Sequence, residues 1–379
     1  MTTPSAQCNR PEVRPRVTPS DGVRPSGLLT PEERLIGSLI GTAMGDAIGL
    51  PYEGLSRRRA ARMLGAPSRH RLFFGRGMVS DDTEHACMTA QALITSGGDV
   101  ALFRKHLAWR LRWWLLPLPA GVGLATARAI LRLWVGISPE RSGVFSAGNG
   151  PAMRAPILGV AVDDLQALRP LVRASTRLTH TDEKAEFGAL AAALAAHLAS
   201  RQETVAGEEF LARLKTLLKG EGAEFLALMQ SAVDSARQGQ ATVDFAAALG
   251  QGQGVSGYMY HTMPVVIQAW LRHQGDFRAA IIAMVECGGD ADSTAAILGG
   301  IVGAGTGRQG IALEWQSGLL EWPRSLGWMA RLGAKLGAEP AGSSDKRAPG
   351  LFFPAVLLRN LFFLAVVLFH GFRRLLPPY

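Results

Sequence analysis

The chain has 379 residues, room for one large domain or two ordinary ones, and 47% of them are hydrophobic. Its formal net charge is +9, but much of the excess lies near the two ends, without a basic cluster interleaved with aromatics between them, which argues against a specific nucleic-acid partner. The cysteines Cys8, Cys87 and Cys287 are too widely spaced for a disulfide framework or a zinc cluster, so we expect a reducing, cytoplasmic location.

Residues 1–27 are rich in Pro, Arg, Ser and Thr and are expected to form a disordered leader. Order is predicted to begin at Thr30, which can cap a helix, with Pro31 at its first position and Glu33 completing a capping box. A domain is therefore expected from residue 28 onward.

The first predicted helix carries three glycines four residues apart, which share one face and would let another backbone approach closely: Gly37, Gly41 and Gly45. The predicted helix at 292–303 has glycines on one face as well, Gly299 and Gly303. Glycine costs a helix about 1 kcal/mol relative to alanine, so close packing is the natural reason to retain it.

Helical patterns recur to residue 320, and strand signals are nearly absent. The remaining helices are predicted at 83–96, 100–115, 125–135, 164–178, 182–201, 207–218, 224–238, 242–250, 262–272, 277–287 and 310–320. The fold class is therefore predicted to be all-α, a compact multi-helix bundle spanning 28–337, followed by a linker at 338–350.

Two segments crowd carboxylates and hydroxyls between apolar stretches, and each opens into a predicted helix. One contains Ser80, Asp81 and Asp82, and the other contains Asp290, Asp292 and Ser293 after a Gly-Gly pair. Either loop alone is more simply explained as a helix cap. Two such loops in one chain favour a site for a pair of hard divalent cations, because adjacent carboxylates repel one another unless a cation compensates them.

Three further segments contain residues that suit a ligand cleft. Glu53 follows the first helix and is either a surface glutamate or a general base. The stretch 146–156 holds glycines whose amides can converge on phosphate, although an ordinary turn is the simpler interpretation. His180 lies before the helix at 182–201, which Thr181 or Asp182 would cap, and is either structural or a contact to a base or ribose.

Together these motifs resemble the ADP-ribosylglycohydrolase family, over about residues 30–330 and in the family's order. The matching segments are 45–53 (Gly-Asp-Ala-x-Gly-x-Pro-x-Glu), 80–83 (Ser-Asp-Asp-Thr), 148–154 (Gly-Asn-Gly-x-x-Met-Arg), 179–180 (Thr-His) and 288–292 (Gly-Gly-Asp-x-Asp).

The resemblance implies an enzyme with two Mg²⁺ or Mn²⁺ ions that cuts the bond at C1 of the distal ribose of an ADP-ribosylated protein or small molecule. It implies metal ligands at Ser80, Asp81, Asp82, Asp290, Asp292 and Ser293. Catalytic acids and bases would be Glu53 and Asp81, and the substrate cleft would be lined by Gly148, Asn149, Gly150, Met153, Arg154 and His180. We expect Tyr258 and Tyr260 to flank the adenine by stacking.

The chain departs from the family pattern at three positions. At Ser80 and Ser293 the family often has threonine, and serine retains the hydroxyl group. At Ala291 the family often has threonine as well, and alanine lacks the hydroxyl group. Two alternatives remain: a non-catalytic ADP-ribose or nucleotide binder of the same fold, and a metal-dependent nucleotide phosphohydrolase.

The apolar tail at 351–379 allows three interpretations: a membrane anchor, a helix lying in the membrane interface, and a helix packed on the catalytic domain. Its most apolar stretch is interrupted by Pro354, Arg359 and Asn360. After Asn360 the sequence shows no clear polar face, so we expect membrane contact through residues 351–376.

Overall fold

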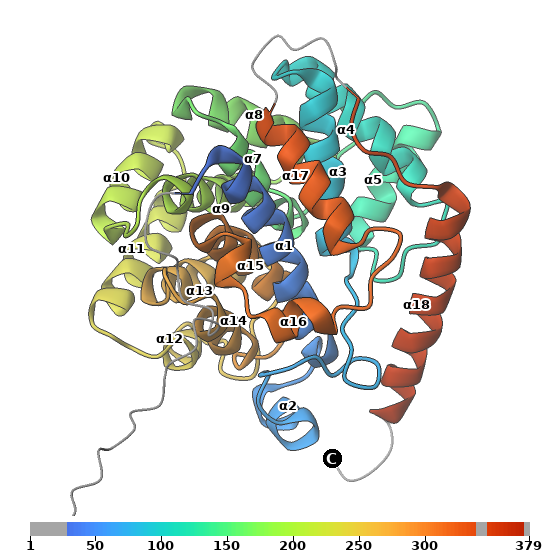
Figure 1. Ribbon diagram of the computed structural model, residues 1–379. Helices are drawn as coiled ribbons and strands as arrows, with labels where there is room; N and C mark the ends of the chain where they lie inside the picture. The colour runs from blue at the N-terminus through green and yellow to red at the C-terminus, as the bar shows by residue number, and fades with distance from the viewer. Residues whose placement is uncertain (1–28, 339–346, 375–379) are drawn as a thin grey trace, which may run out of the picture.

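The computed structural model describes residues 29–338 and 347–374 and is entirely helical (Figure 1). The first nine α-helices are α1 (Pro31–Gly49), α2 (Arg57–Leu64), α3 (Asp81–Ser96), α4 (Val100–Trp114), α5 (Leu124–Trp134), α6 (Gly150–Met153), α7 (Pro156–Ala161), α8 (Leu165–Arg177) and α9 (Glu183–Arg201). The others are α10 (Gly207–Leu218), α11 (Ala223–Arg237), α12 (Thr242–Ala248), α13 (Met259–Arg272), α14 (Phe277–Val285), α15 (Ala291–Thr306), α16 (Leu313–Gly318), α17 (Leu326–Ala338) and α18 (Phe353–Arg373). Two short 3₁₀ helices, η1 (Leu50–Tyr52) and η2 (Arg308–Gly310), complete the elements.

The predicted all-α class is confirmed, since the described chain forms only isolated bridges and no strand. Helices α2, α6, α7 and α17 were not anticipated. The predicted leader, residues 1–27, lies outside the described residues, as do residues 339–346 of the predicted linker. At the start of α1 the capping box is present, because Glu33 N donates to Thr30 Oγ1 at 3.2 Å and Thr30 N donates to Glu33 Oε2 at 2.8 Å.

Helices α1 and α15 lie antiparallel at the centre of the molecule, with their backbones in direct contact (Figure 1). A Cβ on Gly41 would lie 2.2 Å from the Gly299 carbonyl oxygen, and one on Gly37 would lie 2.2 Å from that of Gly303. The close approach predicted for the glycine face of α1 is therefore confirmed, with α15 as the partner. This packing places the end of α1 beside the beginning of α15.

Helix α9 is the second central element, buried from Ala185 to Ser200. Its alanines let neighbouring helices pack closely, and a Cβ on Gly159 of α7 would lie 1.8 Å from the Ala193 carbonyl oxygen. Asp182 caps the helix by accepting a hydrogen bond from Lys184 N at 2.9 Å. Of the two predicted caps, Thr181 and Asp182, the structure therefore has Asp182. Helices α7, α8, α13 and α15 surround α9 and complete the core.

Helix α18 packs along one side of the bundle (Figure 1). Its polarity is inverted relative to an ordinary surface helix. Arg359, Asn360 and His370 are buried, whereas many of its leucines and phenylalanines are exposed. Asn360 Nδ2 donates to the Pro117 carbonyl at 2.8 Å, and His370 Nε2 lies 3.1 Å from the Pro51 carbonyl oxygen. By length and composition it is the one helix of the described chain that could cross a membrane; here it is packed on the domain, the third of the interpretations above.

Candidate functional site

A cavity of about 850 Å³ opens where the end of α1, the start of α3 and the start of α15 meet. Eleven residues singled out in the sequence line it: Glu53, Ser80, Asp81, Gly148, Asn149, Gly150, Met153, His180, Asp290, Asp292 and Ser293. They come from five separate segments of the chain, so the fold brings the predicted loops together at one place.

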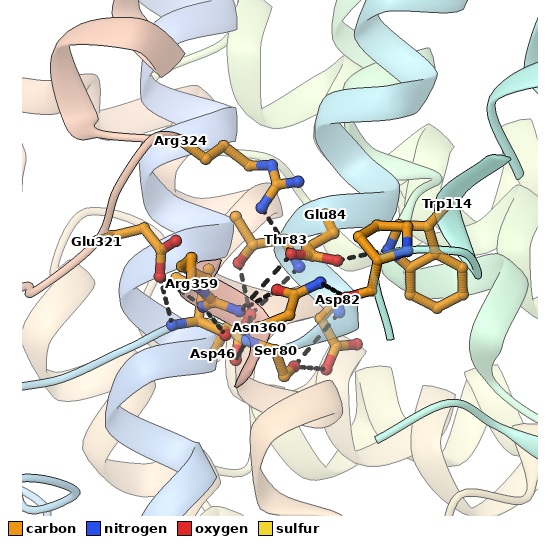
Figure 2. Close-up of polar contacts among 12 residues, drawn as sticks. Asp46, Ser80, Asp82, Thr83, Glu84, Trp114, Glu321, Arg324, Arg359 and Asn360 are labelled. Carbon is orange, nitrogen blue, oxygen red and sulfur yellow. Dashed lines mark hydrogen bonds and ion pairs between the residues drawn. The ribbon is translucent and has the colours of Figure 1, made fainter. Parts of the chain in front are cut away.

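Asp46, in the last turn of α1, holds the Ser80 loop in position (Figure 2). Its carboxylate accepts hydrogen bonds from Ser80 N at 2.9 Å, Thr83 N at 3.2 Å and Thr83 Oγ1 at 2.5 Å. Burial raises the pKa of Asp46 to about 7, although these hydrogen bonds favour its charged form. Its role was missed because a single acid near a helix end carries no signal of what it bonds.

The loop that carries Asp290 is fixed by backbone hydrogen bonds from two sides. Gly54 N donates to the Gly289 carbonyl at 2.7 Å, and Asp290 N donates to the Val255 carbonyl at 2.7 Å. Gly289 has a φ of 81°, and a Cβ there would lie 2.1 Å from Val255 O. Only glycine fits this position, so the Gly-Gly pair allows three loops to meet at the cavity.

The two acidic loops are joined through Asp82. Ser80 Oγ donates to Asp82 Oδ2 at 3.0 Å, and Ser293 Oγ donates to the same oxygen at 3.2 Å. The other carboxylate oxygen, Oδ1, is buried without a hydrogen-bond partner. Asp82 itself lies just behind the cavity surface, 1% exposed, and binds both serines that line it.

The acids of the cavity repel one another. Burial, followed by the neighbouring carboxylates, raises the pKa of Asp82 and of Asp292 well above the ordinary value. Asp81 shows the same effect, with Asp46 as its strongest neighbour. Burial raises the pKa of Asp290 too, while Asn149 Nδ2 donates to its Oδ2 at 2.6 Å and opposes the rise. Such a cluster carries more negative charge than its surroundings compensate.

The chemistry of this donor set suits hard divalent cations, since carboxylate and hydroxyl oxygens are their preferred ligands. The unpartnered Oδ1 of Asp82 is consistent with that use. Across residues 29–338 and 347–374, no group of three or more His, Cys, Asp and Glu side chains has the spacing of a preformed metal site. The serine hydroxyls instead bond to Asp82, so side-chain rotation would be needed to free these oxygens for cations.

Glu53 lies at the mouth of the cavity on the loop after η1. Desolvation, followed by the Asp290 carboxylate, raises its pKa, and Arg374 opposes this rise. Arg374 also donates to the Glu53 carbonyl at 2.8 Å and to the Pro51 carbonyl at 2.7 Å. The far end of α18 thus fixes the loop that carries Glu53.

A glycine-rich wall faces the acids. A Cβ on Gly148 would lie 3.2 Å from His180 Nε2, so the glycine keeps the imidazole open to the cavity. Burial and the nearby Arg154 guanidinium lower the pKa of His180 to about 3. The imidazole is therefore neutral near pH 7 and can hydrogen-bond a ligand but cannot supply positive charge.

Three predicted substrate contacts lie elsewhere. Arg154 is fully buried behind the wall, where its guanidinium donates to Ser175 and to Thr179 Oγ1, so the expectation that it lines the cleft is not met. Tyr258 accepts a hydrogen bond from Lys184, and Tyr260 lines a separate hollow of about 550 Å³. Neither tyrosine lines the acidic cavity: Tyr258 bonds to Lys184 at the start of α9, and Tyr260 stacks on Phe225 of α11.

Sequence reasoning missed the contribution of α18 to the site. Phe363 and Val367, on its inner face, line the cavity. Arg359 Nη2 donates to the Val79 carbonyl at 2.6 Å and to Glu321 Oε2 at 2.6 Å, directly before Ser80 (Figure 2). The available signal was the helical spacing of the polar residues Arg359, His370 and Arg374, which places them on the same face as Phe363 and Val367.

Comparisons with known proteins agree with this picture. The model of the ADP-ribosylglycohydrolase family matches residues 28–345. An uncharacterized protein of Archaeoglobus fulgidus is 30% identical over 298 residues, covering 76% of this chain and 92% of that protein. The ADP-ribosyl-dinitrogen reductase glycohydrolase of Rhodospirillum rubrum is 28% identical, and the aligned region covers 76% of this chain and 90% of that protein. ADP-ribosylhydrolase ARH3 of Gallus gallus is 24% identical, and the aligned region covers 76% of this chain and 89% of that protein.

Among solved structures, an ADP-ribosylglycohydrolase-related protein complex superimposes with a TM-score of 0.61. It is 25% identical and covers 81% of this chain and 98% of its own. The family match ends at residue 345, so α18 lies beyond it.

Proposed function

This chain belongs to the ADP-ribosylglycohydrolase family, and from that premise we propose that it is a metal-dependent hydrolase of ADP-ribosylated substrates. The bond cut is the glycosidic bond at C1 of the distal ribose, and ADP-ribose is the product. The substrate is an ADP-ribosylated protein or a small molecule that contains ADP-ribose. One observation carries the proposal: Glu53, Asp81, Asp290 and Asp292 come from three segments and line one cavity.

Two Mg²⁺ or Mn²⁺ ions are the proposed cofactors, held by oxygens of the two acidic loops. The ligands would be Ser80, Asp81, Asp82, Asp290, Asp292 and Ser293. When bound, such ions polarise oxygens and lower the pKa of bound water. Asp46 would keep the Ser80 loop in place through its bonds to Ser80 N and Thr83.

The chain supplies a base and a binding wall for the reaction. Glu53, or Asp81, accepts the proton of the attacking water, and burial raises the pKa of the Glu53 carboxyl, which favours its taking up a proton. The C1–leaving-group bond breaks through an oxocarbenium-like state, as in other glycoside hydrolysis. Gly148, Gly150, Met153 and the neutral His180 form the wall against which the rest of ADP-ribose would bind.

The direct test is incubation of the purified chain with peptides ADP-ribosylated on arginine or on serine, with and without EDTA. The proposal expects free ADP-ribose that depends on Mg²⁺ or Mn²⁺, and the more rapidly cleaved peptide identifies the leaving group. Calorimetric binding of ADP-ribose without any release from either peptide would indicate a non-catalytic binder. Release of inorganic phosphate from a nucleotide would indicate a phosphohydrolase.

A further inference from the structure

Helix α18 presents a continuous apolar stripe to solvent. Its outer residues recur at helical spacing and are between 38% and 66% exposed: Leu358, Leu361, Leu364, Leu368, Phe369 and Phe372. Large apolar side chains at this density on an exposed helix face are unusual for a protein surface. The stripe therefore indicates a surface that contacts another molecule or a membrane.

The helix cannot bury this stripe by rolling over. Arg359 is 1% exposed and pairs with Glu321 at 2.6 Å, and Asn360 and His370 are bonded to carbonyls of the domain. A helix that left the domain to span a bilayer would carry Arg359 into hydrocarbon and leave Glu321 without its partner. The inner face thus holds α18 along the domain with the stripe outward.

The surface beside α18 extends the apolar area. Phe74, at the tip of the turn formed by residues 73–76, is 88% exposed with a φ of 46°. Its neighbour Phe73 packs edge-on against Phe362 of α18, with 5.5 Å between ring centroids. Near the middle of the helix, Leu118 is 56% exposed next to Pro117, which accepts the hydrogen bond from Asn360.

The segments that flank the stripe carry positive charge and no negative charge. Residues 54–80 contain the arginines Arg57, Arg58, Arg59, Arg62, Arg69, Arg71 and Arg76 and neither Asp nor Glu. Residues 347–374 again contain no acid, and Arg347 and Arg373 are exposed near the two ends of this segment, whereas Arg359 is buried against Glu321 and Arg374 bonds to the loop of Glu53. Arg59 Nη2 donates to the Arg374 carbonyl at 2.8 Å, which joins α2 to the end of α18.

We propose that α18 and Phe74 form a lipid-binding surface that lies flat in the interface of an anionic membrane. The apolar stripe enters the boundary between headgroups and acyl chains, and the flanking arginines bind lipid phosphates. A second copy of the chain fits this face less well, because a symmetric contact would bring one set of arginines close to its equivalent without an acid between them. An anionic bilayer neutralises both flanks.

The test uses the purified full chain in flotation with vesicles of phosphatidylcholine alone and with vesicles that also contain phosphatidylglycerol. The chain is expected to float with the anionic vesicles, less so at high salt, and to be released by an alkaline carbonate wash. Leu361→Gln/Leu368→Gln should weaken binding by about 100-fold, since two buried leucines are lost. The matched control is Leu131→Gln/Val135→Gln on the exposed side of α5, which should bind as wild type.

Circular dichroism and activity on a soluble substrate should be unchanged in both variants, because the four side chains touch neither the cavity nor the core. Three results would each overturn the proposal. The first is a wild type that remains in the aqueous fraction with every vesicle. The second is a wild type that resists the carbonate wash, as a membrane-spanning helix does. The third is a dimer in sedimentation that is lost in the Leu361→Gln/Leu368→Gln variant, which would make the stripe an interface between copies.

Discussion

Arg359 in α18 and Glu321 in the loop after α16 form an ion pair at 2.6 Å that is shut off from solvent (Figure 2). Both side chains also bond to the backbone of Val79. Arg359 donates to the Val79 carbonyl at 2.6 Å, and the Val79 N–H donates to Glu321 at 3.3 Å. Nearby, Arg324 pairs with Glu84 of α3 at 2.6 Å. Two positive and two negative groups thus meet directly behind the Ser80 loop.

Replacing Arg359 with methionine should destabilise the fold strongly. The variant leaves the buried Glu321 without its ion-pair partner and two carboxylates, Glu321 and Glu84, beside the single Arg324, which costs about 3–5 kcal/mol of unfolding free energy. Urea denaturation measures it, and Arg359→Met/Glu321→Gln should recover part of the loss. As a control, Arg213→Met removes only the exposed pair with Glu209 and should cost less than about 1 kcal/mol. An equal loss in the two single variants would contradict the assigned role of the buried pair.

Asp292→Asn should separate stability from activity. It removes one of several mutually repelling carboxylates, so the melting temperature of the EDTA-treated protein should rise by about 1–3 °C. Turnover of an ADP-ribosylated peptide should fall at least about 100-fold, and Mg²⁺ should no longer raise the melting temperature. Asp163→Asn, at a fully exposed acid, should leave all three measurements unchanged. Wild-type turnover in Asp292→Asn with added Mg²⁺ would contradict the metal assignment.

Binding of Mg²⁺ or Mn²⁺ should release protons. Burial and mutual repulsion raise the pKa of Asp81, Asp82 and Asp292, so the metal-free site holds protons that a cation must displace. Raised carboxyl pKa values also mean that the metal-free fold loses stability as pH rises through them. Because protons leave these carboxyl groups as the pH rises, apparent affinity for the cation should increase as the pH rises above the ordinary range of a carboxyl group. Calorimetry in buffers of different ionisation enthalpy measures the release, and identical heats in all buffers would refute it.

Gly41→Ala should disrupt the central helix pair. The new methyl group would lie 2.2 Å from the Gly299 carbonyl oxygen, a backbone atom that cannot move aside alone. We expect a loss of about 2 kcal/mol or more in unfolding free energy, with reduced activity because α1 and α15 carry the site loops. Gly371→Ala, which faces open space in α18, should be neutral or stabilising by up to about 1 kcal/mol. Thermal unfolding of both variants distinguishes steric disruption from helix propensity.

The helical class and the convergence of the acidic loops could be predicted because both leave local signals. Helical periodicity located the ends of most helices to within a few residues, and the glycine spacing of α1 predicted a close backbone contact. Short helices such as α7, with six residues, offer too few turns for a periodic pattern. The register of α1 on α15 could not be predicted, since it depends on which carbonyls meet which glycines.

Side-chain direction was the weaker part of the prediction. Arg154 follows a glycine-rich turn, where an arginine can point to either side of the wall. Its direction is set by buried acceptors at Ser175 and Thr179, which the motif does not contain. The tail was difficult for a different reason. Hydrophobicity assigns the apolar face of a helix to the core, whereas α18 buries Arg359 and His370 and exposes its leucines.

The contact between α1 and α15 has a consequence for biosynthesis. Helix α1 ends at Gly49, and its partner begins at Ala291, so a ribosome must add most of the chain before the glycine face of α1 is covered. At about 5–20 residues per second this delay is roughly 10–50 s. During that time the apolar surface of α1 is available to chaperones and to neighbouring nascent chains. The proposed cation site needs the loops at the ends of both helices, so it can form only late in synthesis, once the start of α15 has emerged.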